Sequence, residues 1–227
     1  MALSSSSPAC TPFSKSSVRP AIASRGVFQT DFENDDLNEK PEDFYVMEYD
    51  VPGSKDTNSR VKDTSSIGMC PGPEGNRGVR LFDNSKSKNT YIRYDLPSMK
   101  AGYFSAWVYL NSGNSDKYVM YAKEKGGDVS YLVNARSNGE WGNGNGNFTW
   151  WFSNPNHSLG RWYLIEVVFD VRKGRYSVWI NQKLVAKENN IPNNPGKEWD
   201  YFYMNPAPVG SWGSMYVDDV TIMDLTE

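Results

Sequence analysis

The sequence predicts an all-β protein, an antiparallel β-sandwich preceded by a flexible N-terminal tail. Helical periodicity is nearly absent, and segments that alternate apolar and polar residues recur at intervals of roughly 8–15 residues. Clusters of Gly, Asn, Pro and Ser separate these segments, as in sandwiches and barrels. Hydrophobic residues make up 38% of the chain and aromatic residues 14%, so aromatic side chains must supply much of the buried area.

Residues 1–26 differ from the rest of the chain because they are rich in Ser, carry three basic residues and contain no acid. We predict a tail or arm over 1–26 and one β-sandwich domain over 27–227. A targeting peptide, a disordered extension and an arm that orders on a neighbouring subunit all fit this composition. These three alternatives stay open, and the third would give self-assembly through the arm.

Composition excludes two classes of partner. The chain has 24 basic and 27 acidic residues, and it lacks the clustered basic face that nucleic-acid binding requires. It also lacks a run of about 18 apolar residues, so no membrane span is expected. Cys10 and Cys70 are too few for a disulfide framework, and whether they pair stays open.

The stretch GYFSAWVYL at 102–110 alternates between two faces, because successive side chains of a strand point to opposite sides. The predicted core face carries Phe104, Ala106, Val108 and Leu110. The other face carries Tyr103, Ser105, Trp107 and Tyr109.

An antiparallel meander is predicted after Gly160. A strand over 162–171 places Tyr163, Ile165, Val167, Phe169 and Val171 on the core face. A tight turn at 172–175 follows, in which Gly174 takes a positive φ. The next strand places Tyr176, Val178 and Ile180 on the core face, and Asn181-Gln182 turns the chain into a strand over 183–187.

Three further strands complete the expected sandwich. The first, over 27–32, and the last, over 215–223, are expected to pair and to bring the chain ends together. The stretch GEWGNGNGNFTWWF at 139–152 predicts a hairpin with a Gly/Asn loop, whose Trp150 and Trp151 point to opposite faces. One of this pair packs in the core, and we expect Trp151 to be the one that faces a ligand.

These segments resemble the concanavalin A-like lectin/glucanase superfamily, of the laminin-G-like kind, over residues 27–225. The resemblance rests on Thr30-Asp-Phe-Glu-Asn34, YFSAWVYL and MYVDDVTIMDL, and most specifically on the strand–turn–strand from Trp162 to Lys187. Gln182 stands where the family usually has the Gly of an Asn-Gly turn. The resemblance implies a jelly roll in an extracellular or surface-exposed setting, with organelle targeting by the Ser-rich leader as the alternative.

The superfold includes hydrolases, lyases, sugar-binding modules and virion proteins, so function must come from the site. A retaining glucanase needs two carboxylates about 5 Å apart. Glu166 and Asp170 share a strand face, but a rise of roughly 3.3 Å per residue separates them by about 13 Å.

A polysaccharide lyase acting on a uronate needs a base and a group that neutralises the carboxylate, and no residues are singled out for these roles.

Binding of a polysaccharide or glycan without catalysis is therefore the favoured function, and no catalytic residue is assigned. Flat aromatic rings stack on the apolar faces of sugars, and an aromatic patch on a solvated face usually marks a partner. The predicted ligand-binding residues are Tyr103, Trp107, Tyr109, Trp151, Arg175, Trp179 and Asn181. A uronate polysaccharide lyase and a structural or decoration protein of an assembly such as a virion are the alternatives.

The resemblance also implies a structural Ca²⁺ where the first and last strands meet. Phe32-Glu33 near the start and Asp218-Asp219 near the end match the acidic pattern of this site. Calcium takes several oxygen ligands. The predicted ligands are Asp31, Glu33, Asp218 and Asp219.

Overall fold

The computed structural model describes residues 26–47, 58–67, 73, 75–85, 89–144, 150–152, 156–192 and 198–226. Apart from Gly26, the predicted tail over 1–26 lies outside these residues, as do Cys10 and Cys70. Among the residues described, no helix has the length and hydropathy needed to cross a bilayer.

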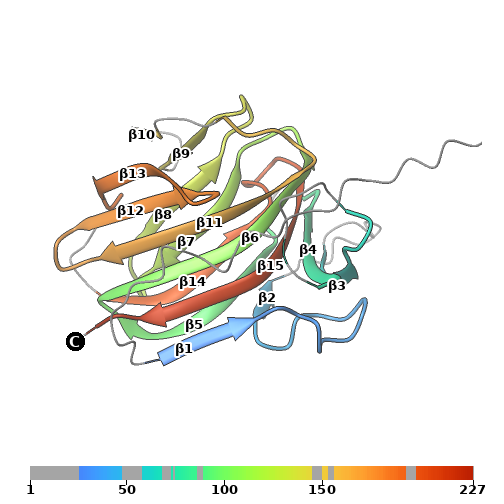
Figure 1. Cartoon of the computed structure of the whole chain (residues 1–227), viewed down its shortest axis with the longest axis horizontal. Helices are drawn as coiled ribbons and strands as arrows, with labels where there is room; N and C mark the ends of the chain where they lie inside the picture. The colour runs from blue at the N-terminus through green and yellow to red at the C-terminus, as the bar shows by residue number, and fades with distance from the viewer. Residues whose placement is uncertain are drawn as a thin grey trace, which may run out of the picture.

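The described chain forms two antiparallel sheets, and Figure 1 shows one behind the other. The eight-stranded sheet has the order β13 (Lys183–Asn190), β12 (Arg175–Ile180), β11 (Arg161–Asp170), β6 (Ala101–Gly113), β15 (Gly213–Asp224), β4 (Arg77–Asp83) and β3 (Asn58–Asp63), and β1 (Gly26–Thr30) also pairs with β15. The seven-stranded sheet has the order β10 (Trp150–Trp151), β9 (Trp141–Asn143), β8 (Val129–Ala135), β7 (Lys117–Lys123), β14 (Trp199–Asn205), β5 (Tyr91–Met99) and β2 (Tyr45–Met47). The predicted all-β sandwich is confirmed.

The main hydrophobic core lies between the two sheets, and the predicted alternation of β6 and β11 places their side chains in it. The four predicted core residues of β6 are fully buried there. The predicted core residues from Tyr163 to Ile180, in β11, in β12 and at Val171 between them, are buried in the same core. The seven-stranded sheet contributes Ile92, Phe202 and Met204 to the same core.

Both predicted turns of the meander are present. Gly174 has a φ of 65°, the left-handed conformation that glycine adopts without a steric cost. Asn181 and Gln182 also have positive φ, at 49° and 65°. Two successive positive φ values are the signature of a type I′ hairpin turn, so the turn geometry is kept although Gln182 replaces the usual glycine.

The expected pairing of the first and last strands is also confirmed, since β1 pairs antiparallel with β15 from Gly26↔Asp224 to Thr30↔Val220. The predicted hairpin at 139–152 is present as β9 paired with β10. The side chains of Trp150 and Trp151 lie outside the description. Trp141, which opens β9, is buried in the core and packs against Tyr163.

The outward face of the eight-stranded sheet is more covered than an alternating strand pattern predicts. Trp107, Trp162 and Leu164 form a second buried cluster on it. The indole nitrogen of Trp162 donates a 3.2 Å hydrogen bond to the carbonyl of Ile67, so the chain that follows β3 reaches this face. Period-2 alternation identifies the two faces of a strand, but it does not show which faces other segments cover.

Candidate functional site

The outward face of the seven-stranded sheet carries a row of aromatic and cationic side chains that crosses five strands. Cross-strand partners join Tyr45 of β2 to Arg93 of β5, Arg93 to Tyr203 of β14, Tyr203 to Tyr121 of β7, and Tyr121 to Tyr131 of β8. Their neighbours in sequence, such as Ile92, Ala122 and Phe202, face the core. We call these five residues the tyrosine row.

Neighbouring members of the tyrosine row are in ring contact. Tyr121 and Tyr203 stack with their centroids 4.9 Å apart and their planes at 4°. Tyr131 lies 5.4 Å from Tyr121, and the guanidinium of Arg93 lies 4.3 Å from the ring centroid of Tyr45. Such contacts stabilise an aromatic cluster beyond its area burial and fix the ring orientations.

Three more tyrosines flank the row. Tyr118 lies 4.6 Å from Tyr131, Tyr91 lies 5.2 Å from Tyr203, and Tyr201 contacts both Tyr203 and the Arg93 guanidinium. All three rings are half-buried. Exposure therefore changes along the row: Tyr121 and Tyr203 at its centre are each 7% exposed, whereas Tyr45 at its end is 47% exposed. A ligand on this face would meet the flanking rings and Tyr45 first.

A second cross-strand row runs beside the tyrosine row. Asn205 of β14 pairs with Tyr118 of β7, and Tyr118 pairs with Asn134 of β8. The Asn205 amide accepts a hydrogen bond from the Ala207 N–H, and the Asn134 amide donates one to the Gly144 carbonyl. Asn134 Oδ1 and Asn205 Nδ2 are buried without a regular hydrogen bond, and the Asn205 amide lies close enough to the Tyr121 hydroxyl to oppose the rise of the Tyr121 pKa. We call these three residues the amide row.

Unpaired buried amides are uncommon in native proteins, because each lost hydrogen bond leaves a desolvation cost. The amide row offers one donor and one acceptor on either side of Tyr118. The amide row therefore lies beside the aromatic surface of the seven-stranded sheet.

Burial raises the pKa of every central tyrosine on this face. Burial raises the pKa of Tyr118 to about 12, and the neighbouring Tyr131 adds to this rise. The pKa of Tyr203 is also raised to about 12 by burial, although Arg93 opposes the rise. Burial raises the pKa values of Tyr121 and Tyr131 as well. These phenols are therefore protonated hydrogen-bond donors at neutral pH.

The ligand residues predicted from sequence lie on different parts of the sandwich. Tyr103 has no exposed surface, and its hydroxyl donates a 2.9 Å hydrogen bond to the Glu166 carboxylate. Trp107 is 7% exposed within the second buried cluster, where Tyr109 packs against it. Trp179 of β12 is half-buried on the same outward face. A glycan-stacking role for these residues stays a prediction.

The remaining predicted ligand residues make structural contacts. The Asn181 amide oxygen accepts a 2.9 Å hydrogen bond from the Leu164 N–H, which ties the type I′ turn to β11. Arg175 is exposed and donates to the Glu188 carbonyl. Trp151 belongs to β10 of the seven-stranded sheet, whereas Trp107 and Trp179 belong to the other sheet. The fold therefore does not bring all seven residues to one face.

The sequence carries a signal for the tyrosine row. Within Tyr201-Phe-Tyr203 and Tyr91-Ile-Arg93 the polar aromatic and cationic residues alternate with core residues, which places each set on one outward face. Sequence alone does not reveal that these segments are neighbours, because β7, β14 and β5 pair across long stretches of the chain.

The four predicted calcium ligands gather where β1 and β15 meet. Asp218 is fully buried in β15, and its Oδ2 has no hydrogen-bond partner. Burial raises the pKa of Asp218 to about 9, and the charges of Asp219, Glu33 and Asp31 add to the rise. The charges of Asp31, Glu33 and Asp219 thus lie near enough to act on Asp218, and their role as calcium ligands stays a prediction.

The acidic group fits a cation only in part. Glu33 Oε1 already accepts hydrogen bonds from the Asn76 and Arg77 N–H groups, at 2.8 and 2.6 Å. Asp31 Oδ1 accepts one from the Glu33 N–H. Within the described ranges, no three His, Cys, Asp or Glu side chains are arranged to hold a metal ion. The atom that fits a cation best is Asp218 Oδ2, a buried carboxylate oxygen that lacks a partner.

Comparison with known proteins identifies the fold. No family model and no curated protein matches the chain. Among solved structures, "Cellulose induced protein, Cip1" aligns with a TM-score of 0.60 and 14% identity, covering 88% of this chain and 97% of that one. A sialidase aligns at 0.53 and 10% identity, and Trypanosoma rangeli sialidase in complex with sialic acid at 0.51 and 10%.

The sialidase alignments cover 82% and 78% of this chain but only 19% and 30% of the sialidase chains, so they match a part of those proteins. At these identities the likeness is one of fold. Together with two antiparallel sheets and the absence of helices among the described residues, it shows that the protein has the concanavalin A-like jelly-roll fold.

Proposed function

We propose that the protein binds a polysaccharide or glycan, without modifying it, on the outward face of the seven-stranded sheet. The observation that carries this proposal is the amide row beside the tyrosine row. Sugar rings present apolar C–H faces that stack on aromatic rings, and hydroxyls that both donate and accept hydrogen bonds. Asn134 Oδ1 supplies a buried acceptor beside Tyr118, and Asn205 Nδ2 supplies a buried donor that also faces the Tyr121 hydroxyl.

Arg93 sets the orientation of one end of this surface. Its guanidinium forms a 2.7 Å ion pair with Asp95 and lies over the rings of Tyr45 and Tyr201. Such a sandwich holds two aromatic rings in fixed orientations without using their hydroxyls. A rigid aromatic surface loses little conformational entropy when a ligand binds, which favours affinity.

The protonation state of the tyrosines supports binding rather than elimination chemistry. A lyase that used a tyrosine as its base would need a phenolate near the working pH. Burial raises the pKa values of Tyr118, Tyr121 and Tyr203 instead. The structural neighbours include a protein described as cellulose induced and sialidases, which are carbohydrate-related proteins, and this supports a glycan partner at the level of fold.

We also propose that the acidic group at the β1–β15 junction holds a structural Ca²⁺. The unpartnered Asp218 Oδ2 supports this proposal, since a buried carboxylate needs a counter-charge or a proton. Asp31, Glu33 and Asp219 would lie around the ion, and backbone carbonyls and water would complete its oxygen shell.

Affinity electrophoresis of the full chain tests the binding proposal. The protein would migrate through native gels that contain a neutral β-glucan, a soluble cellulose derivative, a mannan or a uronate polysaccharide, with a non-binding protein of similar charge as the reference. Retardation in at least one polysaccharide is the expected result. Unchanged mobility in every gel, together with no retention on immobilised oligosaccharides, would contradict the proposal.

A further inference from the structure

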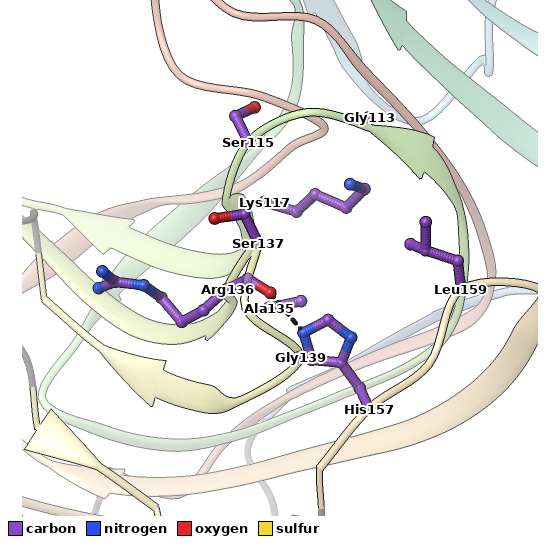
Figure 2. Close-up of a pocket in the computed structure, with 9 residues that line it drawn as sticks. All are labelled: Gly113, Ser115, Lys117, Ala135, Arg136, Ser137, Gly139, His157 and Leu159. Atoms are coloured by element: carbon purple, nitrogen blue, oxygen red, sulfur yellow. Dashed lines mark hydrogen bonds between the residues drawn. The ribbon is translucent and has the colours of Figure 1, made fainter.

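A small pocket lies where β7 begins and β8 ends, next in register to the Tyr118–Asn134 pair. Its cavity is about 100 Å³, enough for a ligand of a few heavy atoms. Its lining comes from the end of β6, the start of β7, the end of β8 and the segment before β11. Figure 2 shows the Lys117 side chain and the His157 ring directed toward the same space, while the Arg136 side chain points away from it.

Lys117 places in this pocket a buried amine that has no ion-pair partner. The residue is only 3% exposed, and its Nζ forms no hydrogen bond or ion pair with the residues that the structure describes. Burial lowers the pKa of Lys117 to about 8, and Asp116 opposes this shift. Gly113 lets the amine lie close to the backbone, because a Cβ at that position would sit 2.9 Å from Lys117 Nζ.

The nearby carboxylates are engaged elsewhere. Asp116 forms a 2.8 Å ion pair with Arg136 and accepts a hydrogen bond from the Ser137 N–H. Glu140 accepts a hydrogen bond from the Asn138 amide. The residues that line the pocket include Lys117 and Arg136 but no acid, and Arg136 is paired with Asp116, so the unpaired positive charge at the lining is that of Lys117.

His157 adds an open nitrogen to the same space. Its Nε2 lies 2.8 Å from the Arg136 carbonyl oxygen, which can only accept, so Nε2 carries the hydrogen of the neutral ring. The other nitrogen, Nδ1, is buried and has no hydrogen-bond partner. Burial lowers the pKa of His157 and the Lys117 charge lowers it further, whereas Asp116 and the Arg136 and Glu140 backbone groups oppose this.

We propose that this pocket binds a small oxyanion, a carboxylate or a phosphate, held by the Lys117 ammonium and by the protonated His157 ring. An anion here would provide the counter-charge that Lys117 lacks and would give Nδ1–H an acceptor. By linkage, an anion that favours the imidazolium binds more tightly as the pH falls through the His157 pKa. This inference does not depend on the proposed glycan function.

The single histidine of the chain makes the test direct, since its ring protons give one set of NMR signals to follow. The titration midpoint of His157 would be measured in chloride, in acetate and in phosphate at equal ionic strength. We expect acetate or phosphate to raise the midpoint, and a rise of one pH unit would mean about tenfold tighter binding to the protonated form. The anion with the larger rise identifies the ligand class.

Two variants separate site binding from general screening. In Lys117→Met the titration midpoint of His157 should rise in chloride, because the positive charge of Lys117 no longer opposes protonation of the ring. This midpoint should also no longer change when acetate or phosphate replaces chloride. Lys183→Met, at an exposed position on β13, is the matched control and should behave as the wild type. If Lys117→Met does not fold, His157→Gln replaces it, and the rise in melting temperature with acetate, which is fully ionised between pH 6 and 8, should lose its dependence on pH in that window. Equal midpoints in all three salts would overturn the proposal.

Discussion

Tyr121 and Tyr203, from strands that are neighbours in the seven-stranded sheet but distant in the chain, stack with their rings 4.9 Å apart and nearly parallel. Each is 7% exposed, so the stack forms the centre of the outward face and the half-buried rings around it form its contact surface.

Asn205→Ala should weaken glycan binding more than it weakens the fold. The substitution removes the buried Nδ2 donor that faces the Tyr121 hydroxyl, together with the bond from the Ala207 N–H, and one such bond contributes about 1 kcal/mol to stability. The free energy of unfolding, from denaturant titration, should fall by about that amount. The affinity for the retained polysaccharide should fall about tenfold, or about 1.4 kcal/mol.

The control for this substitution is Asn138→Ala, an exposed amide in the loop after β8. Isothermal titration of both variants with the same oligosaccharide compares the two amides. Equal affinities for wild type and Asn205→Ala would rule out a ligand role for the amide row.

Tyr103→Phe should destabilise the protein and leave glycan binding unchanged. The Tyr103 hydroxyl donates to the fully buried Glu166 carboxylate, and losing a donor to a buried charged group costs about 1–3 kcal/mol. Tyr109→Phe is the matched control, because the Tyr109 hydroxyl makes no hydrogen bond with the residues described. A loss of glycan affinity in Tyr103→Phe at unchanged stability would instead favour the ligand role predicted from sequence.

Alkaline pH should destabilise the fold through the tyrosine row. The folded pKa of Tyr118 and of Tyr203 is raised from 10 to about 12 by burial, so the native state keeps protons that the unfolded chain releases. Stability is then fully present below pH 10 and is lost as the pH rises toward 12. Phenolate absorbance and circular dichroism should change together in this window. Complete titration of every tyrosine near pH 10 in the folded protein would contradict the buried row.

Calcium should stabilise the strand junction. A ligand that binds only the native state at one hundred times its Kd adds about 2.7 kcal/mol to the free energy of unfolding. The melting temperature should therefore rise in Ca²⁺ relative to EDTA, and Mg²⁺ should have a smaller effect because it demands a tighter octahedral shell. Asp218→Asn should abolish the response to Ca²⁺. Superimposable melting curves in Ca²⁺ and EDTA would remove the calcium proposal.

Local pattern was enough to predict the sandwich. Alternation in β6 and β11 identified the core face residue by residue, since burial follows the period-2 geometry of a strand. The pairing of β1 with β15 followed from their places as first and last strands, and it brings Asp31 and Glu33 near Asp218.

The alternation within single strands could not identify the functional face. Tyr103 and Trp107 lie on the non-core face of β6 as predicted, yet both are buried, Tyr103 in a cluster with Met223 and Leu225 and Trp107 in the second buried cluster. The tyrosine row depends on the register of five strands, and register is set by pairings between distant segments. The pattern of a single strand therefore shows which aromatic residues share a face, but it does not show which rings are in contact across strands.

The most direct test of the central claim compares one aromatic residue on each outward face. Tyr201 on the seven-stranded sheet and Trp179 on the eight-stranded sheet are both half-buried, so truncation of either should leave the fold intact. Binding of Tyr201→Ala and Trp179→Ala to the polysaccharide that retards the wild type most would be measured by affinity electrophoresis. Our account predicts a loss of about tenfold or more for Tyr201→Ala and wild-type binding for Trp179→Ala. Wild-type binding by Tyr201→Ala with loss in Trp179→Ala would contradict it and would place the glycan on the opposite face.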